Sequence, residues 1–79
     1  MRTFKIELSE HDLGQLIDGL CARADAWEKT ARYHRTGEVP DDILVEECRD
    51  AEEAEQIAEH YRSIIETINK QREAQNGRA

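Results

Sequence analysis

The chain has 79 residues, 38% of them hydrophobic and 37% charged, with a formal net charge of −7. A chain of this length forms one small domain, which we expect to span residues 1–79, and its composition is too apolar and too periodic for a disordered protein. The negative charge disfavours direct binding to nucleic acid or to an anionic membrane surface, because both require a basic field.

The N-terminal segment alternates apolar and polar side chains. Phe4, Ile6 and Leu8 are separated by polar residues within the sequence TFKIEL. A period of two is typical of a half-buried strand. We therefore expect a short β-strand over residues 1–8.

A long helix is predicted next. Ser9 stands three residues before Asp12, a spacing that resembles a capping box. The apolar positions then repeat in alternating steps of four and three, at Leu13, Ile17, Leu20, Ala24, Trp27, Ala31 and His34. This pattern predicts a narrow, coiled-coil-like seam. Gly37 is a natural C-terminal stop, so the helix should cover residues 9–36.

A second long helix is predicted over residues 50–75, followed by a disordered tail at residues 76–79. Asp50 and Glu53 have the spacing of a capping box. The apolar face that follows consists of Ala51, Ala54, Ile57, Ala58, Tyr61, Ile64, Ile65 and Ile68. These positions form a wider stripe than that of the first helix, which suggests contact with more than one neighbour.

Residues 37–49 form the connector between the helices. Its apolar residues Ile43, Leu44 and Val45 need a buried environment. The segment forms either a short helix after Pro40 or a strand beside the N-terminal one. The sequence leaves both alternatives open.

The predicted fold is mainly all-α: an antiparallel hairpin of two long helices with a short N-terminal β-strand and a short connector element. Aligning the helix ends places Trp27 opposite Ala58 and Ala31 opposite Ala54, so that large side chains face small ones. The same alignment pairs branched side chains at the far end, namely Leu20 with Ile65 and Ile17 with Ile68. Two helices alone make a thin core, and the strand, the connector or a second subunit of a homodimer must supply the missing layer.

The two cysteines do not suggest a disulfide framework. Cys21 and Cys48 lie far apart in the predicted hairpin, and no C-x-x-C pair indicates zinc. The N-terminus lacks the apolar core of a signal peptide. We therefore expect a cytoplasmic protein without a cofactor.

The acidic residues are concentrated in one segment. Residues 38–59, the acidic block, contain ten acidic residues and a single Arg. The block is either a solvated helix face or a surface that docks on a basic partner. The candidate docking residues are Asp41, Asp42, Glu46, Glu47, Glu52, Glu53, Glu55 and Glu59. A basic turn at Lys29, Arg32 and Arg35 could instead close onto the block and neutralise part of it.

Metal binding and catalysis find weaker support in the sequence. None of the three His residues has a Glu three positions before it, so the carboxylate-bundle motif is absent. Asp25 with Glu28, and Glu47 with Asp50, loosely resemble the magnesium motifs of MazG-like nucleotide pyrophosphohydrolases, with Asp in place of the first Glu of the first motif. We expect neither a metal site nor an enzyme and keep a MazG-like hydrolase as a second alternative.

The acids of EVPDDILVEECRDAEEAEQIAE, on a small helical chain, resemble those of phage-encoded anti-defence proteins of the anti-CRISPR type, some of which are DNA mimics. The resemblance lies in size, acidity and helicity. It implies an inhibitor in the host-cell cytoplasm that docks on the nucleic-acid-binding surface of a defence complex and blocks access to DNA. The first alternative is a helical module that self-associates through its apolar face.

Overall fold

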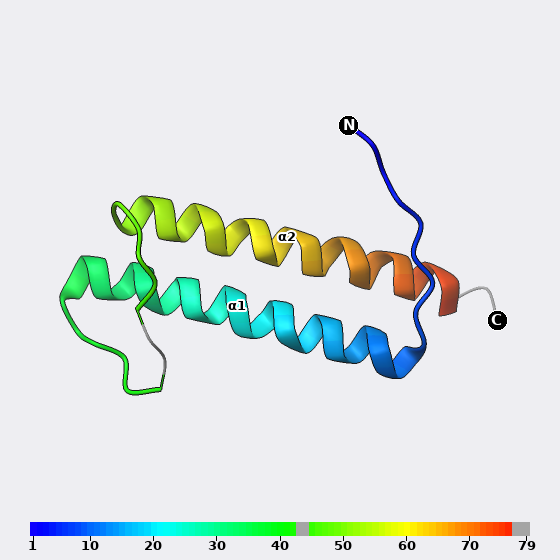
Figure 1. Cartoon of the computed structure of the whole chain (residues 1–79), viewed down its shortest axis with the longest axis horizontal. Helices are drawn as coiled ribbons and strands as arrows, with labels where there is room; N and C mark the ends of the chain where they lie inside the picture. Colours follow the sequence, from blue (N-terminus) through cyan, green and yellow to red (C-terminus); the bar gives the residue numbers. More distant parts are fainter. Residues whose placement is uncertain (43–44, 77–79) are drawn as a thin grey trace.

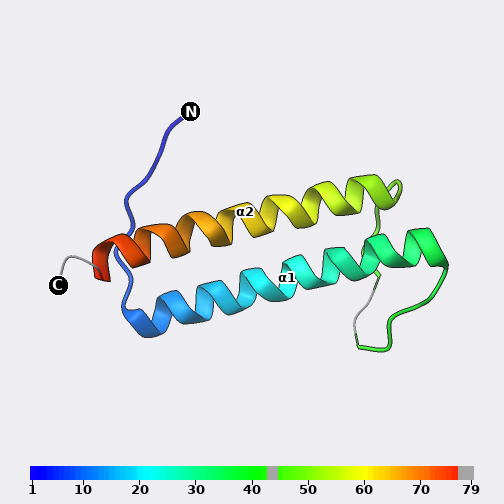
Figure 2. The ribbon, with the colours of Figure 1, turned by 180° about the vertical axis from the view of Figure 1, so that it is seen from behind.

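Two long helices lie side by side and antiparallel. A computed structural model of the chain describes residues 1–42 and 45–76. Helix α1 spans Glu10–Thr36 and helix α2 spans Ala51–Asn76. They run in opposite directions along the longest dimension of the molecule, as Figures 1 and 2 show from its two sides. The predicted hairpin is confirmed, and each predicted helix boundary lies within one residue of the observed one.

Helix α1 is capped at both ends as predicted. The Ser9 hydroxyl accepts a hydrogen bond from the backbone N–H of Asp12 at 3.1 Å, which satisfies a donor that the first turn leaves free. At the other end, Gly37 adopts a left-handed conformation with φ 78°. Its N–H donates to the carbonyl of Tyr33 at 2.7 Å, and a residue without a Cβ adopts this conformation without strain.

Helix α2 begins with a variant of the predicted capping box. The Asp50 carboxylate accepts a hydrogen bond from the N–H of Glu53 at 2.8 Å, as the motif requires. The Glu53 carboxylate accepts from the N–H of Arg49 at 3.1 Å rather than from that of Asp50. The carboxylates of Asp50 and Glu53 therefore hold the backbone at Arg49 and Asp50, the two residues that precede α2.

The core lies at the connector end of the hairpin. Trp27, Ala31, Ala54 and Ala58 form one buried cluster, which brings together both residues of each predicted pair of large and small side chains. The alanines allow the helix backbones to approach closely, and the indole ring fills the space that remains. The partly buried side chains packed against this cluster are Cys48, Ile57 and Tyr61.

The far end of the hairpin is less well covered than predicted. Ile65 is buried there, but its expected partner Leu20 is only half-buried, as are Ile17 and Ile68. The expected third layer over this end is not formed within residues 1–42 and 45–76. The apolar stripes of both helices therefore lack a cover where α1 begins and α2 ends.

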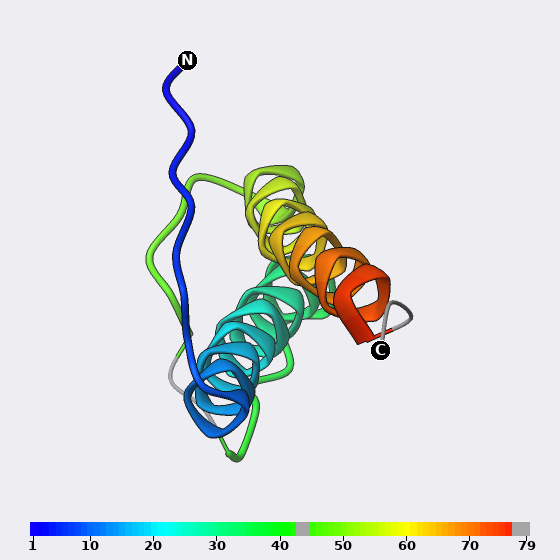
Figure 3. The same cartoon turned by 90° about the vertical axis from the view of Figure 1, so that its right-hand side faces the viewer.

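The strand predicted at the N-terminus is not formed. Residues 1–9 adopt no regular structure, and Phe4 and Ile6 are 74% and 76% exposed. In Figures 1 and 3 this segment leaves the first turn of α1 and extends away from the helix pair. A strand requires a neighbour with free backbone groups, and the described connector lies at the opposite end of the hairpin.

The connector also differs from both alternatives. Residues 37–42 and 45–50 form neither a helix nor a strand. Ile43 and Leu44 lie outside the described residues, as do positions 77–79 of the predicted tail. The first residue of that tail, Asn76, is the last residue of α2.

Within the described part of the chain, neither helix has a stretch long and apolar enough to cross a membrane.

Candidate docking surface

One buried hydroxyl attaches the connector to α1. The side chain of Thr30 is completely buried. Its Oγ1 donates to the carbonyl of Ala26 at 2.8 Å and accepts a hydrogen bond from the backbone N–H of Glu46 at 3.1 Å. Sequence reasoning alone does not identify this residue, and its only signal is its position beside Ala31 on the apolar seam. The bond places the second half of the connector against the side of α1.

Two acids of the connector pair with bases of α1. The Arg23 guanidinium donates to the Glu46 carboxylate at 2.7 Å and also lies over the rings of Trp27 and Tyr61, each centroid being 5.9 Å away. Lys29 forms an ion pair with Asp42. The connector is therefore held to α1 by two ion pairs as well as by the backbone bond to Thr30.

The ion pair between Lys29 and Asp42 shifts the pKa values of both side chains. The ammonium group holds the pKa of Asp42 below its usual value of 3.8. The carboxylates of Asp42 and, to a smaller extent, Asp25 raise the pKa of Lys29. Each charged form is stabilised by hydrogen bonding to the opposite charge.

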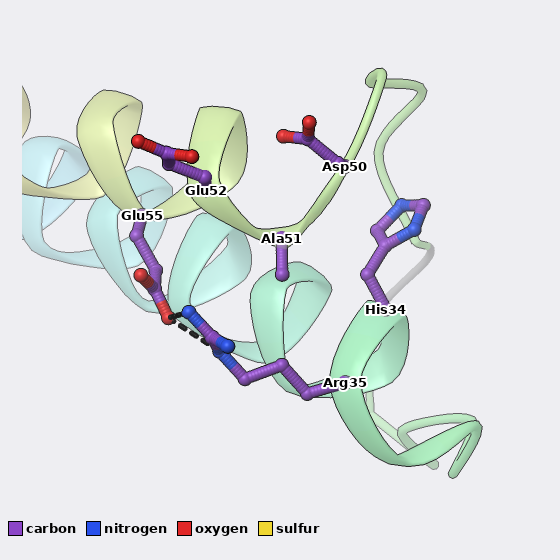
Figure 4. A pocket seen from close by; sticks show the side chains of 6 residues that line it. All are labelled: His34, Arg35, Asp50, Ala51, Glu52 and Glu55. Carbon is purple, nitrogen blue, oxygen red and sulfur yellow. Dashed lines mark hydrogen bonds and ion pairs between the residues drawn. The ribbon is translucent and has the colours of Figure 1, made fainter.

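The acids at the start of α2 are also partly neutralised. Glu55 accepts from the guanidinium of Arg35 at 2.6 Å, as Figure 4 shows. Glu53 pairs with Arg49 at 3.6 Å. Of the eight candidate docking residues, four are thus engaged by bases of the same chain, namely Asp42, Glu46, Glu53 and Glu55.

The other four candidates remain exposed. Asp41, Glu47, Glu52 and Glu59 have no ion pair within residues 1–42 and 45–76, and we call them the free acids. Glu52 and Glu59 are two helical turns apart, about 10.5 Å along the outer face of α2. The acidic block is therefore divided into a structural half and a solvent-facing half.

An open depression lies where the end of α1 meets the start of α2. Figure 4 shows the side chains that line it: His34, Arg35, Asp50, Ala51, Glu52 and Glu55. Arg35 and Glu55 neutralise one another across it, and Asp50 caps α2. Glu52 also lines the depression and has no ion pair among the described residues.

Next to this depression, Cys48 and His34 are in contact. The thiol Sγ lies 3.2 Å from His34 Nε2 and donates to the carbonyl of Asp50 at 3.5 Å. Burial raises the pKa of the Cys48 thiol, and the nearby carboxylates of Glu53 and Asp50 raise it further. These effects keep the thiol protonated at neutral pH, whereas a nucleophilic cysteine requires the thiolate. Cys48 and Cys21 are both free, as predicted.

Three of the four residues of the MazG-like motifs have structural partners, and the fourth, Glu47, is one of the free acids. Asp25 pairs with Lys29 at 3.1 Å, Glu28 pairs with Arg62 at 2.9 Å, and Asp50 caps α2. Among the described residues, no three His, Cys, Asp or Glu side chains gather in a group that could hold a metal ion.

Comparison with models of protein families, with curated proteins and with solved structures finds no match to this chain. The case for a function therefore rests on the surface itself and on the resemblance in size, acidity and helicity.

Proposed function

We propose that the protein is a non-enzymatic binding protein whose free acids dock on a basic, nucleic-acid-binding surface of a partner protein. The observation that carries the proposal is the division of the acidic block. Bases of the same chain engage four of the candidate carboxylates, yet Asp41, Glu47, Glu52 and Glu59 stay exposed beside them. Exposed like charges near one another repel, and a basic partner relieves that repulsion.

The paired acids support this surface rather than compete with it. Arg23 and Lys29 fix the connector through Glu46 and Asp42, and Arg35 holds the first turns of α2 through Glu55. With the connector and α2 both tied to α1, the free acids are presented from a pre-organised scaffold. A rigid charged surface binds with a smaller loss of conformational entropy than a flexible one.

The biological setting that we propose is inhibition of a host defence complex of the CRISPR type by a phage protein that blocks access to DNA. The support is the resemblance to small phage-encoded anti-defence proteins in size, acidity and helicity. A partner that binds DNA through a basic channel offers the charge that the free acids require.

A charge-reversal experiment tests the proposal. The variant Glu47→Lys, Glu52→Lys, Glu59→Lys is compared with a control of equal net charge, Asp18→Lys, Glu66→Lys, Glu73→Lys, which changes exposed acids outside the block. Each protein is immobilised and exposed to host lysate, with and without duplex DNA as competitor. We expect wild type and control to retain the same nucleic-acid-binding proteins, and the block variant to lose them.

DNA and increasing salt should both release these proteins, because the docking is electrostatic. Equal retention by the block variant and the control would contradict the proposal, and so would retention that DNA does not affect.

A second function, self-association through an apolar face, is favoured by a separate observation. Ile57 and Tyr61 pack against the core, so the exposed apolar surface is not at the middle of α2. It lies at the open end of the hairpin, where Phe4, Ile6, Leu8 and Leu16 are exposed.

A further inference from the structure

The open end of the hairpin has an apolar groove. The N-terminal segment and the ends of both helices line it, with apolar side chains from Phe4, Ile6, Leu8, Leu13, Leu16 and Ile68. Phe4 and Ile6 are about three-quarters exposed, and Leu8 and Leu16 are 46% and 44% exposed. A monomeric protein of this size rarely leaves large apolar side chains gathered in the open, and such patches mark interfaces.

The charge of this region fits a second copy of the chain. The charged residues that line the groove are Lys5, Glu7, Glu10 and Arg72, two bases and two acids. The chain as a whole has a net charge of −7, so most of its surface repels another copy. The groove is locally neutral and contains both signs of charge, as a self-complementary contact requires.

We infer that two copies of this chain form a dimer in which residues 4–8 pair as an antiparallel, two-stranded β-ribbon centred on Ile6. The inference rests on the self-association candidate and not on acidic docking. The apolar face of the ribbon would cover the open ends of both hairpins. The second copy thus supplies the missing layer and the strand partner that the described residues of one chain do not provide.

The sequence of the segment selects this register. With the two-fold axis at Ile6, Lys5 of each chain lies directly opposite Glu7 of the other, and Phe4 lies opposite Leu8. Directly opposite side chains share a face of the ribbon, so the apolar residues gather on one side and the ion pairs on the other.

The neighbouring registers of the two strands pair the side chains less favourably. A shift of one residue places Phe4 opposite Glu7 and so sets an apolar side chain against a charged one. A shift of two places Lys5 opposite Lys5 in one direction, or Glu7 opposite Glu7 in the other. Like charges directly opposite one another destabilise a pair of strands.

A charge swap tests the pairing. In the variant Lys5→Glu, two carboxylates face each other at both ends of the ribbon, and in Glu7→Lys two ammonium groups do so. The double variant Lys5→Glu, Glu7→Lys restores opposite charges at the same positions. Sedimentation equilibrium of the full chain over a range of concentrations gives the dimer dissociation constant of each protein.

We expect wild type to reach twice the monomer mass of 9.1 kDa. Each single variant should dimerise about tenfold more weakly, because two attractive pairs become repulsive, and the double variant should return to within about threefold of wild type. The variant Glu47→Lys, Glu52→Lys, Glu59→Lys should dimerise at least as tightly as wild type, because its smaller negative charge weakens the repulsion between copies. This result separates dimerisation from acidic docking, which the same variant should lose.

A wild-type protein that stays monomeric at 100 µM would overturn the inference. So would a dimer that neither single variant weakens, or one that the double variant does not restore. Circular dichroism at 222 nm verifies that each variant keeps its helices.

Discussion

The hydroxyl of Thr30 accepts a hydrogen bond from the backbone N–H of Glu46 at 3.1 Å, across 16 residues of sequence. The same hydroxyl donates to the carbonyl of Ala26, so both of its hydrogen-bonding functions are used inside the protein. This contact fixes the connector beside α1 and directs the Glu46 side chain towards Arg23. It thereby helps to make Glu46 one of the acids that pair within the chain.

Replacing Thr30 by Val keeps the shape of the side chain but removes the acceptor. The N–H of Glu46 then loses its partner in a partly buried place, and we expect a loss of about 1–2 kcal/mol in the free energy of unfolding. Thr30→Ser retains the hydroxyl and should lose less, about 0.8 kcal/mol for one methyl group. Urea unfolding followed by circular dichroism measures both. A Val variant as stable as wild type would show that the contact is not needed.

Features that depend on nearby residues could be predicted from the sequence. The caps at Ser9, Gly37 and Asp50 each involve residues within four positions, and their spacing is visible in the chain. The meeting of Trp27 and Ala58 in one cluster follows from helical periodicity once the helix ends are aligned.

The individual partners of the connector acids could not be predicted, although Lys29 and Arg35 do close onto the acidic block as the sequence suggested. Nothing local distinguishes Glu46, which pairs with Arg23, from Glu47, which faces solvent. The partner of a charged side chain is set by where the connector lies, and that position depends on Thr30. The period of the N-terminal residues predicts a strand over residues 1–8, but a strand also needs a partner, and the described chain provides none.

The Trp27 side chain should contribute to stability through its volume rather than through its indole N–H. The ring is 8% exposed, and its Nε1 has no hydrogen-bond partner in the described part of the chain. We expect Trp27→Ala to lose about 3–5 kcal/mol, because it leaves a cavity beside the alanines of the core. Trp27→Phe should lose markedly less, since it removes an unpaired donor along with part of the ring. Equal losses in urea unfolding would contradict this account.

The ion pair between Lys29 and Asp42 should make the stability of the folded protein decrease at acidic pH. The pKa of Asp42 is depressed in the folded protein, so its contribution is present above about pH 3.8, its usual value, and is lost as the pH falls through the lower folded value. Asp42→Asn should therefore be less stable than wild type at pH 7, and the difference should shrink on acidification below pH 3.8.

The matched control is Asp41→Asn, which changes an exposed neighbour without an ion pair in the described residues. This control separates the loss of one carboxylate from the loss of the ion pair with Lys29. Thermal unfolding from pH 7 to pH 2 compares the three proteins. A constant difference between wild type and Asp42→Asn would exclude the assigned role.

Cys48 should react slowly as a nucleophile. Burial and two nearby carboxylates raise the pKa of its thiol above the usual 9.0, so little thiolate is present near neutral pH. In a Cys21→Ser background, alkylation by iodoacetamide at pH 7.5 should be slower than that of free cysteine, and faster in urea. A rate above that of free cysteine would point to an activated thiol beside His34 and reopen a catalytic interpretation.

The raised pKa of Cys48 also has a consequence for stability. The unfolded chain releases the thiol proton more readily than the folded one, so the contribution of this group is complete below pH 9.0 and declines as the pH rises towards the folded value. Cys48→Ala should remove this part of the alkaline decline in thermal stability. An identical alkaline profile in the variant would show that the group does not contribute.

The central claim is that the acidic block contains two kinds of acid: those that pair with bases of the same chain, and the free acids. Thermal unfolding of two neutralised variants at low salt tests this claim most directly. Asp42→Asn, Glu46→Gln, Glu55→Gln removes acids that bind bases of α1, whereas Glu47→Gln, Glu52→Gln, Glu59→Gln removes acids without an ion pair in the described chain. Each variant loses three negative charges, so the two variants have the same net charge. We expect the first variant to melt below wild type, and the second to melt at or above it because like-charge repulsion is relieved. A second variant that melts as far below wild type as the first would contradict the division on which the proposed docking surface depends.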